Sequence, residues 1–346
     1  MNLDAWPDDF NAGCLEHAAR MRGVGTDRTL AAKRPGSPFR EHLRMRIGGR
    51  AHLYRNAVLY IDGAGPGGGY AHVNGDLPRL TMDKQATRRR VAALGFPVAA
   101  GRLFPAAEAE AAAAYFRELE RPACVKPNGG KRGDAVFALI SDPQAFAHAF
   151  RSVAARFPKV LVEEHLTGAA VRFFHVAPRV AGVLLARLAN VVGNGVDDVA
   201  TLVAAKNAER LRRDLPGHEP IAVDAEALRF LALQGVGLGH VPPAGRRVFL
   251  RGASNTSSGG DAVTCADWIH PSYTALVETL CRSLPGLRVA GVDTVIRDPR
   301  APAAPGNHWV LEINSAPGVV PFHFPWEGEP RDVAGAIVDR LVAGDW

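Results

Sequence analysis

Short apolar segments that alternate like β-strands, interrupted by amphipathic helices, run through most of this chain. Residues 123–127 (ACVKP) read as a strand, 143–157 as a helix and 160–166 (VLVEEHL) as another strand. Later strands come as neighbours in the sequence, such as 171–178 followed by 180–189. Neighbouring strands pair antiparallel, and antiparallel pairs mixed with helices favour an α+β fold. This pattern is the main constraint on the architecture.

Three units are predicted. Residues 1–81 form a small N-terminal α/β domain with a helix, one strand (57–62, AVLYID) and a glycine-rich loop. Residues 82–168 form a compact lobe that opens with a helix near Asp83, and residues 169–346 form a larger unit. Ligand sites favour the joints between such units, so the boundary between the second and third units is the expected binding region.

Composition narrows the class of protein. The 346 residues are 47% hydrophobic and carry a formal net charge of +6, which suits a globular chain with a mildly basic surface. The charges are scattered, so nucleic-acid binding is not expected. Cysteines are widely spaced, which indicates neither a zinc site nor a disulfide framework. No apolar run reaches the ~20 residues of a membrane span, and the N-terminus is acidic, so we expect a cytoplasmic enzyme without a membrane partner. A homo-oligomer is left open.

The segment 309–318 (WVLEINSAPG) reads as a strand that stops at a Pro-Gly turn. Strand side chains alternate between two faces. We therefore expect Leu311 and Ile313 to point into a core while Glu312 and Asn314 share the other face. Two side chains with oxygen donors would then project together.

A third oxygen donor is expected beside them. Asp293 lies near the end of the segment 288–296, and pairing of that segment with the last strand would place Asp293 next to Glu312 and Asn314. Mg²⁺ favours oxygen ligands and takes one or two carboxylates together with water and phosphate oxygens. The alternative is that the two acids are surface residues of an edge strand, although paired carboxylates without a cation repel each other.

Two glycine-rich loops call for separate interpretations. Residues 63–68 match G-x-G-x-x-G, but no helix follows, so a turn is favoured over a dinucleotide site. The loop 128–133 (NGGKRG) fails the P-loop pattern because Arg132 follows Gly130-Lys131. It nevertheless offers backbone donors and two cations directly after the strand bearing Lys126. Closure over phosphates and an ordinary hairpin turn both remain open.

The segments CVKPNGGKRG, LVEEHLTG, GVDTVI and LEINSAPG occur in the order found in ATP-grasp carboxylate-amine ligases, and the resemblance spans about residues 81–325. The segments between them are most similar to the ATP-grasp modules of cyanophycin synthetase and bifunctional glutathione synthetase. The resemblance implies two α+β lobes that grip ATP, the first over 82–168 acting as a lid, with the small N-terminal domain in front.

The resemblance also implies roles for individual residues. Around the nucleotide, Lys126 would contact adenine and the α-phosphate, and the hinge at the adenine edge would be formed by Glu163, Glu164 and Leu166. The phosphates would be covered by Gly129, Gly130 and Gly133, with positive charge added by Lys84, Arg187 and Arg251. Two magnesium ions, with manganese as a substitute, would be held by Asp293, Glu312 and Asn314. One position departs from the family: Ala170 stands where an acid usually contacts the ribose.

The implied reaction is ATP-dependent formation of an amide bond through an acylphosphate, with release of ADP and phosphate. Amino acids or short peptides would be the substrates, and the arginine excess favours an acidic carboxylate donor. A kinase or other phosphotransferase, in which a hydroxyl replaces the carboxylate, and a non-catalytic ATP-binding module are the alternatives.

Overall fold

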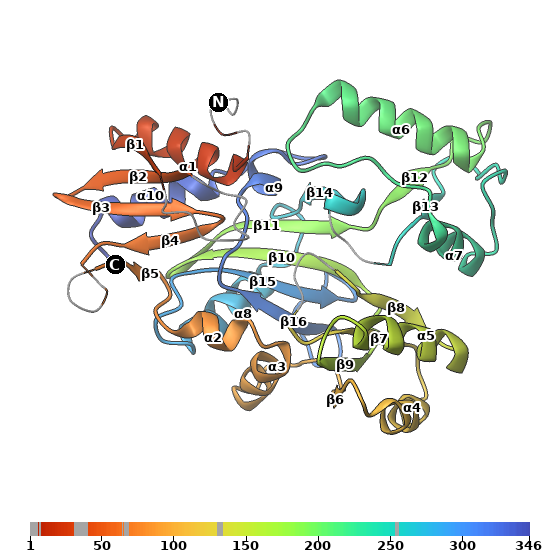
Figure 1. Cartoon of the computed structure of the whole chain (residues 1–346). Helices are drawn as coiled ribbons and strands as arrows, with labels where there is room; N and C mark the ends of the chain where they lie inside the picture. Colours follow the sequence, from red (N-terminus) through yellow and green to blue (C-terminus); the bar gives the residue numbers. More distant parts are fainter. Residues whose placement is uncertain are drawn as a thin grey trace.

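The fold was analysed in a computed structural model that describes residues 6, 8–30, 41–63, 65, 69–129, 134–252 and 256–346. Its described strands form antiparallel sheets of five, five, four and two strands (Figure 1). The α+β class expected from the sequence is confirmed. Within the described ranges, no helix has the length and apolar character needed to cross a membrane.

The N-terminal unit is an antiparallel meander of five strands with a helix packed against it. The sequence predicted only one strand here. The strands β2 and β3 were missed because arginine and histidine occupy many of their positions, and only residues such as Leu43, Met45 and Tyr54 are buried. The elements are α1 (Phe10–Met21), β1 (Gly25–Leu30), β2 (Glu41–Ile47), β3 (Arg50–Arg55), β4 (Val58–Ile61), β5 (Ala71–His72) and α2 (Leu77–Thr81).

A five-stranded central sheet organises the larger unit. Its order is β14-β11-β10-β15-β16, and both faces are covered over part of their length. Helix α8 packs against one face through Tyr273, Val277 and Leu280, while α1, α9 and α10 cover part of the other. The elements are β10 (Ala169–Val176), β11 (Arg179–Arg187), β14 (Asp261–Thr264), α8 (Pro271–Arg282), β15 (Val289–Ile296), β16 (His308–Asn314), α9 (Val320–His323) and α10 (Val333–Val342).

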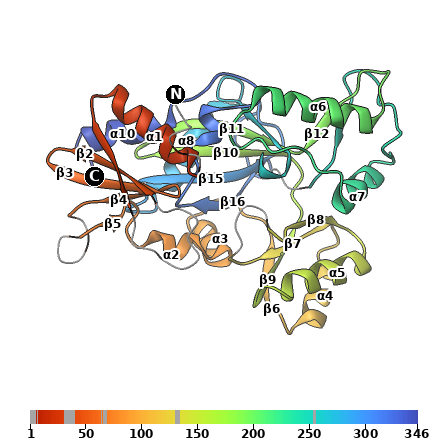
Figure 2. The ribbon, with the colours of Figure 1, turned by 45° about the horizontal axis from the view of Figure 1, so that its top comes forward.

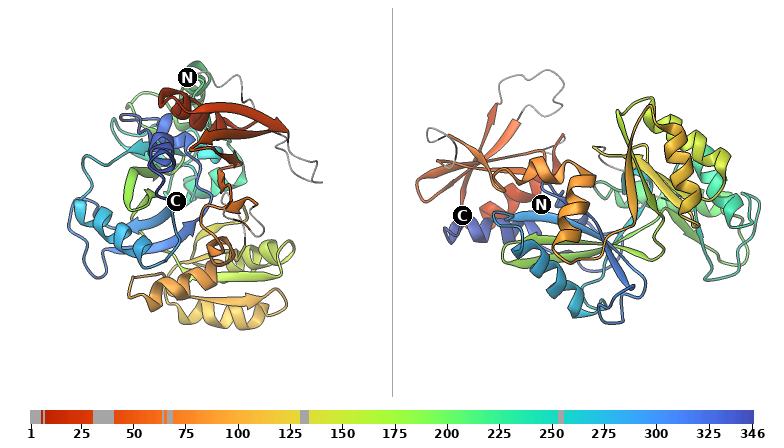
Figure 3. Two further views of the ribbon diagram at one scale, coloured as in Figure 1. Left: turned by 90° about the vertical axis from the view of Figure 1, so that its left-hand side faces the viewer. Right: turned by 90° about the horizontal axis from the view of Figure 1, so that it is seen from below.

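Residues 101–164 build a separate four-stranded lobe with the order β6-β9-β7-β8. Its core combines aliphatic side chains with four buried phenylalanines, of which Phe116 and Phe146 stack at 4.5 Å between ring centroids. Figure 3 shows this lobe and the N-terminal sheet at different ends of the central sheet. The elements are β6 (Gly101–Pro105), α4 (Ala109–Glu118), β7 (Ala123–Pro127), β8 (Phe137–Ile140), α5 (Pro143–Ala154) and β9 (Lys159–Glu164).

Helix α3 (Lys84–Ala93) joins the lobe to the central sheet. Asp83 caps its first turn by accepting a hydrogen bond from the amide of Ala86. Gly95 has a φ of +86°, so it follows the end of the helix in the left-handed conformation that favours glycine. Val91 packs in the core of the central sheet beneath β16, so α3 rests on that sheet.

A small unit between β11 and β14 extends beyond the edge of the central sheet. Helix α7 reaches the four-stranded lobe, where Arg229 donates to the carbonyl of Ala138 at 3.1 Å (Figure 2). The sequence indicated neither α7 nor β12, the antiparallel partner of β13. The elements are β12 (Asn190–Val192), α6 (Val199–Arg213), α7 (Ala225–Leu233), β13 (Arg247–Phe249) and a short 3₁₀ helix (Thr256–Ser258).

A buried carboxylate fastens this small unit to the sheet. Asp261 begins β14, and its oxygens accept hydrogen bonds from Arg210 at 2.7 Å and from Lys206 and Asn190 at 2.8 Å each. The side chains of Asp261 and Arg210 are each 1% exposed. Asp261 is a strand residue through the pairing of β14 with β11, and its burial is possible because Lys206 and Arg210 of helix α6 neutralise its charge.

The N-terminal unit is joined to the central sheet through Asn74. This buried side chain donates to the carbonyls of Val289 and Ser315 and accepts from the amides of Arg288 and Val289. Asn74→Ala removes four hydrogen bonds and leaves buried backbone groups unpaired. We expect a loss of about 2 to 4 kcal/mol in the free energy of unfolding.

Urea denaturation measures this loss. Asn194→Ala is the control, since Asn194 is exposed and bonds only within its own turn. A loss in Asn74→Ala no larger than in Asn194→Ala would mean that the junction contributes little to stability.

Acid should weaken the central sheet through His175. Burial lowers the pKa of this histidine from 6.5 to about 4. The unfolded chain therefore binds a proton that the folded chain does not between these values, and stability falls as the pH drops from about 6.5 to 4, by up to about 3 kcal/mol. His175→Gln should remove this part of the acid sensitivity, measured as the difference in urea midpoint between pH 7 and pH 4.5. An identical difference in both proteins would contradict the assignment.

Candidate active site

Asp293, Glu312 and Asn314 form a platform on strands β15 and β16, at one edge of the central sheet. Asp293 on β15 pairs with Glu312 on β16, and Gly291 pairs with Asn314. Antiparallel neighbours on one face have adjacent side chains, so the three donors lie together as the sequence predicted.

A bulge in β16 changes how the platform is built. The register shifts so that Thr294 pairs with Val310, which leaves Leu311 without a partner on β15. The core residues of β16 are Val310 and Ile313, and the expectation that Leu311 would share the core face with Ile313 is wrong. The bulge lets Val310 and Ile313, three positions apart, face the same core while Glu312 stays beside Asp293.

Basic side chains hold both carboxylates of the platform. The Arg172 guanidinium donates to the two oxygens of Asp293 at 2.6 Å each, and the Lys84 ammonium lies 3.1 Å from Glu312. Burial alone would raise the pKa of Glu312, but Lys84 and then Lys126 hold it below its ordinary value. Asp293 favours the charged guanidinium of Arg172 more than burial disfavours it, so the pKa of Arg172 lies above its usual range.

Arg172 was not predicted as a site residue from the sequence. The available signal was one arginine inside the apolar strand segment VRFFHV, which would face solvent or a carboxylate partner on a neighbouring strand. Its register opposite Asp293 comes from the pairing of β10 with β15.

Lys126 brings the four-stranded lobe to the platform. Its ammonium lies 2.5 Å from Glu163 on β9, and both side chains are buried. Burial disfavours the ammonium ion, but Glu163 keeps the pKa of Lys126 above its ordinary value. Glu312 contributes in the same direction, so Lys126 on the lobe and Glu312 on the central sheet lie within electrostatic reach.

The start of the second glycine-rich loop is fixed to α3. The carbonyl of Asn128 accepts from the amide of Lys84 at 3.2 Å, and its side-chain oxygen accepts from Gln85 at 3.0 Å. Gly129 follows within the described chain. Gly130 and Gly133, predicted to cover phosphates, lie outside the described residues. Asn128 and the backbone of Lys84 are thus held together by these hydrogen bonds.

The predicted hinge residues lie at the end of β9 and just beyond it: Glu163 and Glu164 are its last two residues, and Leu166 follows two positions later. Gly101 lies opposite Glu163, and a side chain at Gly101 would come within 2.5 Å of the Glu163 Cγ atom. Glu164 accepts from the amide of Ala100 at 2.8 Å and from Arg121 at 2.6 Å. Leu166 is half-buried. Their role at an adenine ring stays a prediction.

Arg187 and Arg251 form their ion pairs with carboxylates other than Asp293 and Glu312. Arg187 ends β11, which strand β10 separates from β15, and it pairs with Glu327 at 2.5 Å. Arg251 pairs with Asp224 at 2.8 Å. The predicted role of these two arginines at phosphate groups stays a prediction.

The donor set fits magnesium. Within the described ranges, no three His, Cys, Asp or Glu side chains gather in a way that would hold a metal ion. The platform offers two carboxylates and an amide, and Mg²⁺ typically takes one or two carboxylates and completes its shell with water and substrate phosphates. The Asn314 side-chain oxygen accepts from the amide of Ala316 at 2.9 Å, which fixes its orientation and leaves it a second lone pair.

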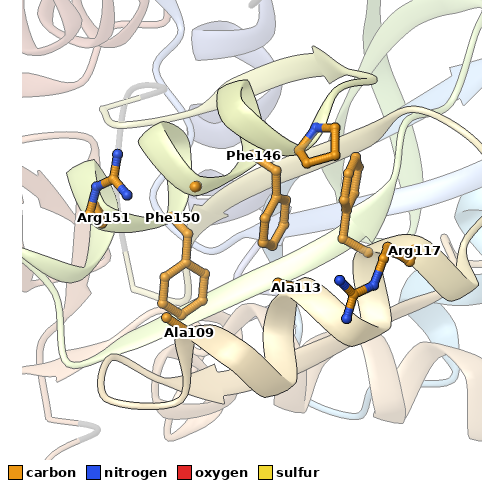
Figure 4. A pocket seen from close by; sticks show the side chains of 9 residues that line it. Ala109, Ala113, Arg117, Phe146, Phe150 and Arg151 are labelled. Atoms are coloured by element: carbon orange, nitrogen blue, oxygen red, sulfur yellow. The ribbon is translucent and has the colours of Figure 1, made fainter.

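A hollow of about 160 Å³ lies elsewhere, between α4 and α5 on the four-stranded lobe (Figure 4). Phe116, Phe146 and Phe150 line it together with two arginines. It contains none of the carboxylates described above. The hollow is therefore separate from the platform.

Comparisons with known proteins agree with this arrangement. No protein-family model matches the sequence. The glutathione biosynthesis bifunctional protein GshAB of Mannheimia succiniciproducens is 34% identical over 277 residues, which are 77% of this chain and 36% of that protein. Cyanophycin synthetase of Nostoc sp. strain PCC 7120 is 33% identical over 271 residues, covering 77% of this chain and 30% of that protein. The chain belongs to the ATP-grasp ligase family.

The fold agrees over nearly the whole chain. The crystal structure of a bifunctional glutathione synthetase from Pasteurella multocida superposes with a TM-score of 0.64 at 26% identity, covering 97% of this chain and 44% of that one. The matched part of this ATP-grasp chain spans about a third of the length of GshAB and of cyanophycin synthetase. The resemblance inferred from the sequence motifs is confirmed.

Proposed function

We propose that this ATP-grasp protein is a carboxylate-amine ligase that joins the carboxylate of an amino acid or short peptide to an amine at the expense of ATP. The observation that supports it most is the meeting of Asp293 and Glu312 with Lys84 and Lys126 at the joint between the lobe and the central sheet. That joint combines ligands for a metal with cations for phosphates.

In the proposed reaction, a carboxylate oxygen of the substrate attacks the γ-phosphorus of ATP and ADP leaves, giving an acylphosphate. The amine nitrogen then attacks the acyl carbon, phosphate leaves, and the nitrogen loses a proton to give the amide. This chain's residues would position and neutralise the reacting groups, since phosphoryl transfer depends chiefly on both. Both nucleophiles in this scheme, the carboxylate and the amine, come from the substrates. The scheme therefore requires no side-chain nucleophile from the protein.

Individual residues have separate tasks in this proposal. Asp293, Glu312 and Asn314 would hold two magnesium ions, with manganese as a substitute, and these ions would neutralise charge on the phosphates. Lys126 would reach the α-phosphate, and the backbone at Glu164 and Leu166 would face the adenine edge. Arg187 and Arg251 would act on the transferring phosphoryl group after closure of the lobe, and the reaction would take place in the cytoplasm, where ATP is available.

The test is a screen of amino-acid and dipeptide pairs for ATP-dependent phosphate release, followed by mass spectrometry. An amide product with ADP and phosphate would support the proposal. A phosphorylated product would indicate a phosphotransferase. ATP binding without turnover across the screen would favour a non-catalytic module. Acidic carboxylate donors such as glutamate and aspartate are the first to test, because the chain carries an excess of arginine.

A further inference from the structure

The platform carboxylates are already neutralised by the protein's own cations. Arg172 is bound to both oxygens of Asp293, Lys84 lies on Glu312, and Lys126 lies on Glu163. Among the described residues, each of these three carboxylates is therefore paired with a basic side chain within 3.1 Å. This ionic cluster has no net charge when all six groups are ionised.

A neutral, largely buried cluster gives little attraction to either ligand alone. A divalent cation arriving by itself must share Glu312 with an ammonium ion at close range, where like charges repel. Nucleotide phosphates arriving by themselves meet cations that carboxylates already hold. When both arrive together, the metal replaces the ammonium at Glu312 and the phosphates replace Glu312 at the ammonium.

The two cations on the platform differ in their freedom to exchange. Arg172 makes a bidentate contact from a strand, and Asp293 retains lone pairs for a metal while that contact persists. Lys84 reaches Glu312 from the first turn of α3, through a flexible stem with a rotatable ammonium group. Its backbone amide is bonded to Asn128, at the start of the glycine-rich loop. The backbone of Lys84 is thus held by a hydrogen bond, whereas its stem has several rotatable bonds through which the ammonium group can reach a different partner.

We infer that Lys84 is an exchange residue that leaves Glu312 for a nucleotide phosphate when a divalent metal takes that carboxylate, which makes metal and nucleotide bind with positive coupling. The inference rests on the proposed nucleotide site. Arg172 keeps Asp293 oriented throughout. The coupling is reciprocal, since each ligand raises the affinity for the other by the same factor.

Lys84→Met tests the exchange because methionine keeps an apolar stem and removes the charge. Binding of Mn²⁺ alone is followed by electron paramagnetic resonance of the free ion, and binding of ADP alone by calorimetry in EDTA. We expect Mn²⁺ alone to bind on the order of tenfold more tightly than to the unmodified protein, ADP alone to bind more weakly, and the coupling factor between them to fall on the order of tenfold or more.

Arg89→Met is the matched control, since Arg89 is an exposed cation on the same helix and its loss changes the net charge equally. It should leave all three quantities unchanged. Lys84→Gln repeats the test with a polar side chain, and urea midpoints confirm that each variant is folded.

The outcomes separate the exchange from the function on which it rests. Tighter Mn²⁺ binding in both Lys84 variants, together with unchanged Mn²⁺ binding in Arg89→Met, supports the exchange. Unchanged or weaker Mn²⁺ binding in the folded Lys84 variants overturns it, even when ADP binding is weakened. Failure of the unmodified protein to bind ADP with Mn²⁺ present overturns the proposed function itself.

Discussion

Glu312→Gln is expected to give a folded protein whose magnesium-dependent turnover falls by about 10²–10³-fold, the loss typical when one charge-stabilising group is removed from an active site. Glutamine keeps the size of the side chain and removes the charge that a metal and Lys84 both require. The fold should persist because Glu312 points away from the core face, where Val310 and Ile313 pack. Asn314→Ala should lower turnover by the same mechanism and to a smaller extent.

The measurement is steady-state turnover over a magnesium titration, with the pair of substrates found by the screen. Glu110→Gln provides the control, since Glu110 is an exposed acid on α4 of the four-stranded lobe. Full activity of both Glu312→Gln and Asn314→Ala at saturating magnesium would rule out the platform as the metal site.

Asp261→Ala should produce the largest loss of stability, about 3 to 5 kcal/mol, the range for breaking a buried ion pair by removing one partner. Arg210 and Lys206 would then be left with positive charge and no carboxylate. Burial already lowers the pKa of both basic groups, and Asp261 acts against that shift, so its removal should lower the two pKa values further.

Urea or thermal denaturation checks this loss. Asp267→Ala is the comparison, because Asp267 is an exposed acid that pairs with Arg331 and an exposed pair contributes under about 1 kcal/mol. A loss below about 1 kcal/mol in Asp261→Ala would show that α6 is held to the sheet by its apolar contacts alone.

These two variants also separate activity from stability. Glu312 lies on the edge strand β16 of the central sheet, and Asp261 lies on the opposite edge strand β14, where it fastens the unit that contains α6 and α7. Glu312→Gln should therefore change turnover without a large change in the urea midpoint. Asp261→Ala should change the midpoint first.

Local patterns were enough to predict the helix near Asp83, the helix over 143–157 and the strands β10, β11, β15 and β16. Asp83 caps the start of α3, and Gly95 follows its end. Such signals can be read from the sequence because a side-chain cap and a left-handed glycine each act within one helical turn. Strands of the N-terminal sheet were missed because a strand exposed on one face has few apolar residues. Helix α7 was missed because its nine residues give a short pattern.

The sequence by itself determined the family, the α+β class and the three oxygen donors of the platform, because motif order and strand alternation are properties of the chain read in one direction. The tertiary structure decided which cations meet those donors. Lys84, Arg172 and Asp293 are separated by 88 or more positions along the chain, and only strand register and the packing of α3 on β16 bring them together. The bulge at Leu311 was likewise settled by the pairing of β16 with β15, because a local sequence cannot state the register of its partner.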